Sequence, residues 1–402
     1  MEYNNKLLNN IKNNYIFTFL ARLDLTQGIW MIYLATQGMS LFQLGILEGI
    51  FHVTSFFMEV PTGVIADIYS RKVSRLLGRV AALIGVLILL FSNSFYLYAL
   101  SFVFIALSYN LESGAGDALI YDSLKELNNE NKYMKISGNK ELFFQMGSFI
   151  AFIAGGYIAT RSYKIAFIIT AVITMITIIQ SFFFTEPNIE YSFNKKLNIF
   201  SSMKNQIVES TKIIKGNKKI GFLIIFVQLI GAFATSMFYY LQNYLKGNGY
   251  TEFHIGILFA ISSLFAAIIG SKTYLLESKI KERGILLIMP IIAIVSIWGI
   301  ALTKYYFIYY IILVIVESII YIATNDYINK LIPSESRATI LSVTSMIFSL
   351  FMITIFPIIG RIGDVYSLKL AFKLLGVLGS ILVIINTYVM IIIKRKEKIN
   401  GC

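Results

Sequence analysis

About twelve long apolar runs fill this 402-residue sequence almost from end to end. A helix needs about 20 mostly apolar residues to cross a bilayer. Because lipid offers no hydrogen-bond partners to backbone N–H and C=O groups, such runs must be helical. The sequence therefore predicts an all-α membrane protein with twelve transmembrane helices, at residues 15–36, 41–62, 76–93, 95–120, 142–160, 163–185, 220–244, 253–275, 284–302, 305–330, 338–360 and 370–394.

The basic charge of the chain follows this topology. The net charge is +13, yet only 14% of the residues are charged, whereas a soluble domain has about 25%. If the N-terminus is inside, 27 of the 35 Lys and Arg residues fall on the inner side and 7 on the outer side. This is the positive-inside bias. We therefore expect a multi-pass protein of the plasma membrane with both termini in the cytoplasm. The basic residues are expected to interact with the lipid bilayer and not with nucleic acid.

One long hydrophilic stretch divides the predicted spans six and six. It covers residues 186–219 and separates an N-terminal six-helix bundle, 1–185, from a C-terminal six-helix bundle, 220–402. Short matches between the halves recur at an offset of 207 residues, such as Gly63 with Gly270. Two six-span repeats of equal orientation are an architecture of secondary transporters, with a substrate site near the midplane.

The residues needed for enzyme chemistry or metal binding are scarce. Cys402 is the single cysteine, and His52 and His254 are the two histidines. The sequence has no G-x4-G-K-[ST] loop, no H-E-x-x-H and no G-x-S-x-G. We therefore expect no cofactor, no metal site and no ATP drive, and a membrane-embedded enzyme is only a remote alternative.

The loop after the second predicted span carries a recognisable motif. It reads Glu59-Val-Pro-Thr-Gly63-Val-Ile-Ala-Asp67-Ile-Tyr-Ser-Arg71-Lys72 and resembles the signature loop of the major facilitator superfamily. The resemblance implies a twelve-helix transporter fold and a gating loop formed by Gly63, Asp67, Arg71 and Lys72. Ile68 and Ser70 depart from the Arg and Gly that the signature usually has at those positions. The alternative is a plain positive-inside turn.

Two further segments resemble the bacterial drug:proton antiporter branch of that superfamily. They are residues 113–124 and 329–342. The resemblance implies a bacterial efflux protein that works as a monomer on a small-molecule substrate and protons. Two features depart from the branch: Asn110 stands where many members have Arg, and the helix-five motif lacks its proline, although Gly155 and Gly156 remain for close packing.

Ionisable residues inside spans are costly and mark functional sites by default. The first span contains Arg22 and Asp24, followed by Gln27. On a continuous helix, Asp24 and Gln27 share one face and Arg22 lies on another. We expect Asp24 to face the transport pathway and Arg22 to reach a neighbouring helix; the alternative is a structural Arg22–Asp24 pair.

Other spans add further candidates. Glu48 and His52 lie at i,i+4 and are close enough for a proton relay or for an ordinary interhelical hydrogen bond. Glu112 lies in the fourth span, and Glu317 lies near the centre of the tenth, with Asn325 on roughly the same face.

These features predict a secondary active transporter, with proton-coupled efflux of small lipophilic or cationic compounds as the leading hypothesis. A carboxyl group in apolar surroundings takes up a proton more readily than one in water, which suits a proton carrier. Acids in an aromatic-rich pathway favour cations. The alternative is a proton-coupled importer of a metabolite such as a sugar or peptide.

Overall fold

The computed structural model is built from helices joined by short turns. It describes residues 2–68, 70–188, 208, 212, 216, 218–332 and 337–400, and no strand occurs among these residues. Eleven of the described helices are long and apolar enough to cross a membrane. The predicted all-α class is confirmed. The helices are α1 (Glu2–Arg22), α2 (Trp30–Thr36), α3 (Leu41–Ile68), α4 (Arg71–Phe91), α5 (Phe95–Glu112), α6 (Ala115–Glu126), a 3-10 turn (Glu130–Lys132), α7 (Tyr133–Ala159), α8 (Tyr163–Ser181), α10 (Lys218–Gly247), α11 (Glu252–Gly270), α12 (Thr273–Leu302), α13 (Tyr306–Leu331), α14 (Arg337–Val365) and α15 (Leu368–Asn400).

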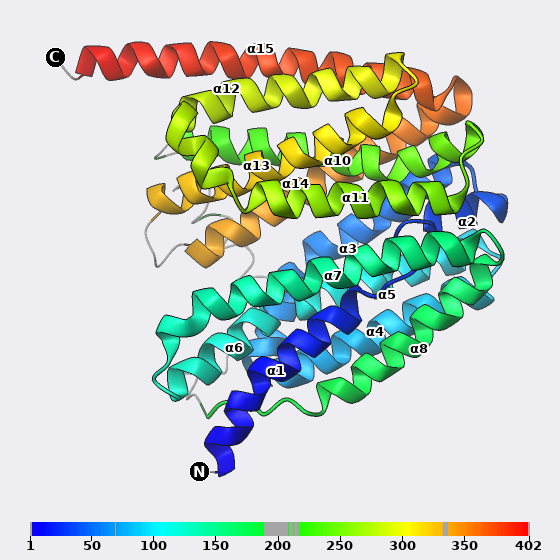
Figure 1. Ribbon diagram of the computed structural model, residues 1–402, viewed down its shortest axis with the longest axis vertical. Helices are drawn as coiled ribbons and strands as arrows, with labels where there is room; N and C mark the ends of the chain where they lie inside the picture. The colour runs from blue at the N-terminus through cyan, green and yellow to red at the C-terminus, as the bar shows by residue number, and fades with distance from the viewer. Residues whose placement is uncertain are drawn as a thin grey trace. The chain divides into compact units, whose positions relative to one another are not determined.

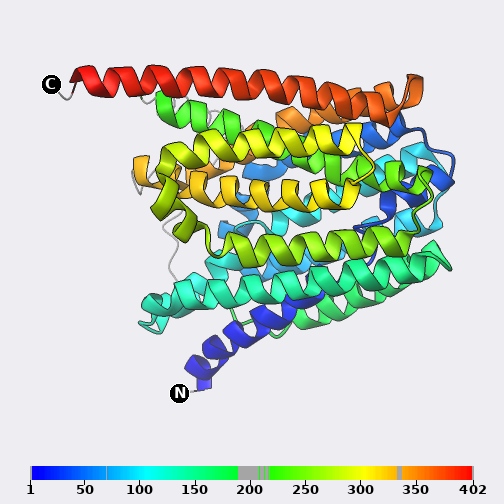
Figure 2. The same cartoon turned by 45° about the horizontal axis from the view of Figure 1, so that its top comes forward.

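The chain forms two compact units. Unit 1 comprises Met1–Met39, Ile46–Ile207 and Gly249–Ala260, and unit 2 comprises Ser40–Gly45, Val208–Asn248 and Ile261–Cys402. In unit 1, α7 and α8 lie side by side (Figure 2). In unit 2, α15 lies along α12 (Figure 1). The division into bundles 1–185 and 220–402 stays a prediction, and most of the 186–219 linker lies outside the described residues.

The first helix begins much earlier than predicted. The hydrophilic residues before the apolar run belong to α1, which starts at Glu2. Its buried residues are Leu7, Asn10, Asn14, Phe17 and Thr18. Their spacing of three, four, three and one places them on one helical face. The helix therefore extends beyond the predicted span 15–36 at its N-terminal end, which hydropathy alone does not register.

Glycines bring α7 into backbone contact with its neighbours in unit 1. A Cβ on Gly147 would lie 2.7 Å from the carbonyl oxygen of Phe19, and one on Gly155 would overlap that of Leu25. Across the other neighbour, a Cβ on Gly156 would lie 2.5 Å from the carbonyl oxygen of Glu252. The expected close packing of Gly155 and Gly156 is confirmed. Small residues allow this approach between helices in a bilayer.

We expect Gly155→Ala to destabilise the protein. The added methyl group must displace backbone, and such overpacking costs about 1–3 kcal/mol. Thermal unfolding in detergent micelles measures the effect as a lower melting temperature. The matched control is Gly138→Ala on the same helix, where a Cβ meets no atom within 4 Å. Equal melting temperatures for the two variants would contradict the packing argument.

Candidate functional site

The first predicted span is interrupted near its middle. α1 ends at Arg22, and α2 begins at Trp30 after a stretch of turns. Inside the turn, Oδ1 of Asp24 accepts hydrogen bonds from the backbone N–H and the hydroxyl of Thr26, at 2.9 and 2.6 Å. The N–H of Leu25 donates to Oγ1 of Thr170 on α8 at 3.1 Å. These side chains replace the lost helical hydrogen bonds, which makes a broken helix tolerable in a bilayer.

Because the helix is broken here, the expectation that Asp24 and Gln27 share one helical face was wrong. Asp24 and Gln27 lie in the turn and not on one face of a helix. The local hydrogen bonds of Asp24 compete with helix formation, which hydropathy does not register. The guanidinium of Arg22 lies 3.8 Å from the ring centre of Phe144 on α7. Among the described residues, Arg22 has no hydrogen bond and no ion pair.

The fourth predicted span is also interrupted. α5 ends at Glu112, and α6 begins at Ala115. Gly114 between them has φ of +76°, a left-handed conformation that costs a residue with a side chain about 1–2 kcal/mol. The predicted span at 95–120 falls within one apolar helical stretch, Phe95–Glu126, but the helix is interrupted at residues 113–114. Unit 1 therefore holds two broken spans, each with an ionisable residue at the break, and discontinuous helices are typical of substrate and ion sites in transporters.

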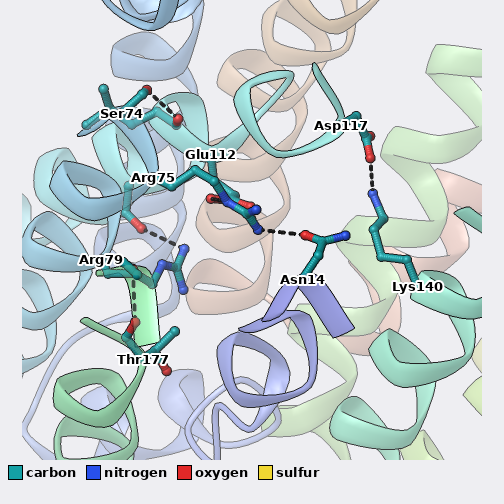
Figure 3. Close-up of polar contacts among 11 residues, drawn as sticks. Asn14, Ser74, Arg75, Arg79, Glu112, Asp117, Lys140 and Thr177 are labelled. Atoms are coloured by element: carbon teal, nitrogen blue, oxygen red, sulfur yellow. Dashed lines mark hydrogen bonds and ion pairs between the residues drawn. The ribbon is translucent and has the colours of Figure 1, made fainter. Parts of the chain in front are cut away.

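Arg75 and Glu112 form the centre of this region (Figure 3). Oε1 and Oε2 of Glu112 accept hydrogen bonds from Nη2 and Nε of Arg75 at 2.9 and 3.2 Å. Nη2 also donates to Oδ1 of Asn14 at 3.0 Å. The guanidinium lies 4.1 Å from the ring centre of Phe17 and 4.4 Å from that of Phe184. The Arg75 side chain is 1% exposed and that of Glu112 27%. The two-point pair has good geometry, and Nη1 of Arg75 is buried without a hydrogen bond.

Arg79 lies one turn further along α4, on the same face as Arg75 (Figure 3). Its Nη2 donates to Oγ of Ser108 at 3.3 Å, and its Nε is buried without a hydrogen bond. Among the described residues Arg79 has no ion pair. Its charge interacts with those of Glu112, Arg22, Arg75 and Asp24. Arg22 interacts in turn with Glu141, so three guanidinium groups and three carboxylates share one region of unit 1.

Sequence reasoning missed Arg75 and Arg79 as site residues. Both were counted among the inner positive charges, since Arg75 precedes the predicted span 76–93 and Arg79 lies in its first turn. The helix begins at Arg71, so the two side chains lie on its packed face. The spacing of Arg71, Arg75 and Arg79 by four residues was the available signal. The positive-inside bias persists when Arg75 and Arg79 are left out of the count of inner Lys and Arg residues.

Polar contacts also join α3 to α5. Nδ2 of Asn110 donates to the carbonyl oxygen of Ser55 at 2.9 Å and to Oε2 of Glu59 at 3.2 Å. On α3 itself, Nε2 of His52 lies 3.6 Å from Oε1 of Glu48, and both side chains are buried. The structure brings the two members of the candidate relay together within one helix.

The start of α4 holds the candidate gating loop. Gly63 and Asp67 lie in the last turns of α3, and the side chain of Asp67 is outside the described part of the structure. Arg71 forms an ion pair with Asp122 on α6. The Nζ of Lys72 donates to the carbonyl oxygen of Phe182 at 2.9 Å. Arg71 and Lys72 thus tie α4 to α6 and to the end of α8.

A carboxylate that sequence reasoning did not single out caps α4. Glu186, just after α8, accepts from the backbone N–H of Arg71 through Oε1 and from that of Lys72 through Oε2, both at 2.9 Å. Oε2 also accepts from Oγ of Ser70 at 2.7 Å. A negative charge at a helix N-terminus satisfies the free N–H groups and complements the helix dipole. Glu186 therefore fixes the loop against the end of the sixth span.

We expect Glu186→Ala to lower the free energy of unfolding by about 1–2 kcal/mol, because the first N–H groups of α4 lose their acceptors. Thermal unfolding in micelles measures the loss. Glu130→Ala, at an exposed acid of the same unit, is the control and should melt like the wild type. A Glu186→Ala protein as stable as the control would show that the cap is not needed.

In unit 2 the candidate residue is Glu317, the twelfth residue of α13. Among the described residues, Glu317 makes no hydrogen bond or ion pair. Its charge acts on Tyr310, two turns earlier. Asn325 lies two turns later on the same helix, and Asp326 beside it binds Lys330 at 2.5 Å. That hydrogen bond raises the pKa of Lys330, which lies beyond the apolar stretch Tyr306–Ile328 of this helix. Glu317 is thus an isolated carboxyl group at the centre of a span.

No group of three or more His, Cys, Asp or Glu side chains in the described part of the chain is arranged to hold a metal ion. The polar groups at both helix breaks are guanidinium groups, carboxylates and amides. Such groups can bind charged or polar small molecules and carry protons.

Comparisons with known proteins agree with this architecture. The family model of the Major Facilitator Superfamily matches residues 15–357. The chain is 25% identical over 394 residues to an uncharacterised MFS-type transporter, YxaM, of Bacillus subtilis (strain 168), covering 93% of this chain and 94% of that protein.

Solved structures show the same fold at low sequence identity. A crystal structure of the nucleoside transporter NupG (D323A mutant) has a TM-score of 0.80 and 13% identity, covering 95% of this chain and 99% of that chain. A peptide transporter POT in complex with sulfate has a TM-score of 0.75 and 13% identity, covering 96% and 95%. A bacterial homologue of the human lysosomal transporter Spinster has a TM-score of 0.71 and 14% identity, covering 98% and 97%.

Proposed function

Since the chain belongs to the major facilitator superfamily, we propose that it is a secondary active transporter that exports small lipophilic organic compounds in exchange for protons. The observation that carries the proposal is Glu317, an ionisable group without a hydrogen bond or ion pair among the described residues, halfway along α13. Such a group inside a span is costly, so its presence indicates a functional role. It can hold a proton in one state of the cycle and release it in another.

The cationic substrate class expected from the sequence depends mainly on Glu317. Of the other acids, Glu112 is paired with Arg75, and Asp24 is bound to Thr26. These two carboxylates are already partnered, so they offer less to a cation than free acids would. We therefore propose lipophilic compounds as the substrate class and leave their charge to direct test.

A metabolite importer is the second candidate. It is supported by the fold likeness to a nucleoside transporter and a peptide transporter, since the same fold serves both directions. Inside-out membrane vesicles that are acidified by respiration separate the two. In the export case, adding a substrate releases protons from vesicles that contain the protein, and a pH-sensitive dye reports it. In the import case, uptake occurs in right-side-out vesicles with a proton gradient directed inward. A panel of cationic, neutral and anionic aromatic compounds covers the substrate classes.

We further propose a gating role for the loop that joins α3 to α4. Asp67 and Arg71 belong to it, and Glu186 and Asp122 hold its α4 end. Contacts at an inner loop, far from the centre of the span, suit control of conformational cycling better than substrate binding. Glu48 and His52 remain a candidate proton relay within α3.

We propose a bacterial plasma membrane location, with the monomer as the working unit and both termini and the 186–219 linker in the cytoplasm. The distribution of Lys and Arg residues along the sequence supports the position of the termini and the linker. Reporter fusions after residue 200 and at the C-terminus should both report a cytoplasmic position. An external signal from either fusion would contradict the twelve-span topology.

A further inference from the structure

The connection from α11 to α12 in unit 2 is a basic segment that runs from Lys272 to Arg283. We propose that this 272–283 segment is a docking surface for anionic phospholipid. Its lysines bind the headgroups, and Tyr274 and Leu275 enter the boundary of the acyl chains. The inference goes beyond the proposed transport function, since it concerns the lipid around the protein and not the substrate.

The length of α12 places the 272–283 segment at the end of a span. α12 has 30 residues, which at 1.5 Å each give about 45 Å, whereas the hydrocarbon core is about 30 Å thick. The 19 residues from Gly284 to Leu302 contain no Lys, Arg, Asp or Glu and almost fill the core alone. The charged residues of α12 all fall before Gly284. They therefore lie at the level of the headgroups.

A bend separates the start of α12 from the span. Lys281 has φ of +61° and ψ of 174°, a conformation that is strained for any residue with a side chain. Gly284 allows a close approach across the bend, because a Cβ there would lie 2.6 Å from Cβ of Ile280. The helical residues before the bend, 273–280, therefore leave the axis of the span (Figure 1).

The helix before the bend exposes one amphipathic face. Tyr274 and Leu275 are 67% and 47% exposed. Ser278 and Lys279, one turn later, are exposed on the same face, and Thr273 on the opposite side is buried. An aromatic ring, an aliphatic side chain and a lysine on one face are typical of helices that lie in a membrane interface.

The charge of the segment matches an anionic lipid. It has four basic and two acidic residues, namely Lys272, Lys279, Lys281, Arg283, Glu277 and Glu282. Glu282 is bound to Lys219 of α10 at 2.7 Å. Lys330, on which the charges of both acids act, is bound to Asp326. With these neighbours included, six basic residues stand against three acidic ones, so the positive excess remains.

Three lysines of the segment are available to a headgroup. Lys272, Lys279 and Lys281 are exposed, and none of them makes an ion pair within the described part of the chain. Long lysine side chains place their charge at the headgroups while their methylene groups cover apolar surface. An anionic lipid surface therefore fits both the charge and the apolar side chains of the segment.

Lipid binding to the purified full-length protein tests the proposal. Native mass spectrometry from neutral micelles measures the affinity for phosphatidylglycerol, with zwitterionic phosphatidylcholine as the match, and we expect a preference for phosphatidylglycerol. A triple variant with Lys272→Gln, Lys279→Gln and Lys281→Gln should weaken that affinity at least about tenfold, since each lysine near an anionic surface contributes about a fivefold factor. If the triple variant does not fold, Lys272→Gln and Lys279→Gln singly should each give about a fivefold loss.

A matched triple variant separates this segment from the general attraction of basic residues for anionic lipid. Lys125→Gln, Lys132→Gln and Lys135→Gln together remove the same charge from exposed lysines of unit 1. Glu126 and Glu130 lie among these lysines and already offset their charge. This control should change the affinity for phosphatidylglycerol by no more than about twofold.

A spin label tests where the amphipathic face lies. Cys402 is the single cysteine, so Cys402→Ser provides a background for Leu275→Cys, with Glu130→Cys as the exposed reference. In vesicles of phosphatidylglycerol and phosphatidylcholine, the label at position 275 should collide mainly with oxygen. The label at position 130 should collide mainly with a water-soluble nickel complex.

Three outcomes would overturn the proposal. They are equal affinity for the two lipids, equal losses in the two triple variants, and a label at position 275 that is as accessible to the nickel complex as the label at position 130. The last would leave the face open to an acidic soluble protein. Proton-driven transport in vesicles is measured separately, so failure of this proposal and failure of the proposed function are distinguishable.

Discussion

Replacing Glu317 by Gln should abolish the dependence of transport on the pH gradient while downhill substrate exchange continues. An amide has nearly the shape of a carboxyl group but cannot gain or lose a proton. For exchange of one proton, a pH difference of one unit supports about a tenfold substrate gradient. We therefore expect the accumulation ratio in vesicles to fall from about ten to about one in Glu317→Gln.

The control for this variant lies on the same helix. Asp326→Asn removes an exposed acid that is paired with Lys330 near the C-terminal end of α13, and it should leave coupling intact. Unchanged proton-driven accumulation in both Glu317→Gln and Asp24→Asn would move the coupling site elsewhere. Glu112 would be examined next, and then Glu48 with His52.

The position of Glu317 could be predicted from the sequence, and the arginine cluster could not. A single acid inside a long apolar run is visible in any hydropathy profile. Arg75 and Arg79 stand at the edge of such a run, where the positive-inside rule assigns a charge to the loop. Only the start of α4 at Arg71 shows that these side chains belong to the helix. Arg75 then lies among Phe17, Phe184 and Asn14, and Arg79 lies 5.7 Å from the ring centre of Phe17.

The helix breaks show a second limit of hydropathy. Lipid makes long apolar runs helical, and most predicted spans were found for that reason. A break needs substitute hydrogen bonds, and these come from single side chains such as Asp24, Thr26 and Thr170. Thr170 is distant in sequence, so its contact could not be foreseen. Ser113-Gly114 was a readable signal, since Ser-Gly pairs often mark turns.

The largest expected effect on stability comes from breaking the Arg75–Glu112 pair. Glu112→Leu leaves the guanidinium of Arg75 buried, with Asn14 as its only remaining polar partner among the described residues. Breaking a buried pair by removing one partner costs about 3–5 kcal/mol, because the other charge stays uncompensated. Unfolding by SDS in mixed micelles should show this loss.

Ranking the variants by their loss of stability tests the role of burial more sharply than the size of a single loss. The side chain of Glu112 is 27% exposed, whereas that of Arg75 is 1% exposed. A stranded Glu112 in Arg75→Met keeps part of its surface exposed, whereas a stranded Arg75 stays buried. We therefore expect Arg75→Met to be less destabilising than Glu112→Leu, and the double variant to recover part of the loss.

An exposed ion pair of the same unit provides the control. Lys140 binds Asp117 at 2.5 Å, with side chains 27% and 51% exposed (Figure 3). Asp117→Ala should change stability by no more than about 1 kcal/mol, as for other exposed pairs. Equal losses of stability in Asp117→Ala and Glu112→Leu would show that burial does not determine the cost of breaking an ion pair.

A larger loss of stability in Arg75→Met than in Glu112→Leu would mean that the arginine stabilises the broken span through its contacts with Phe17 and Phe184. The charge pair would then be secondary.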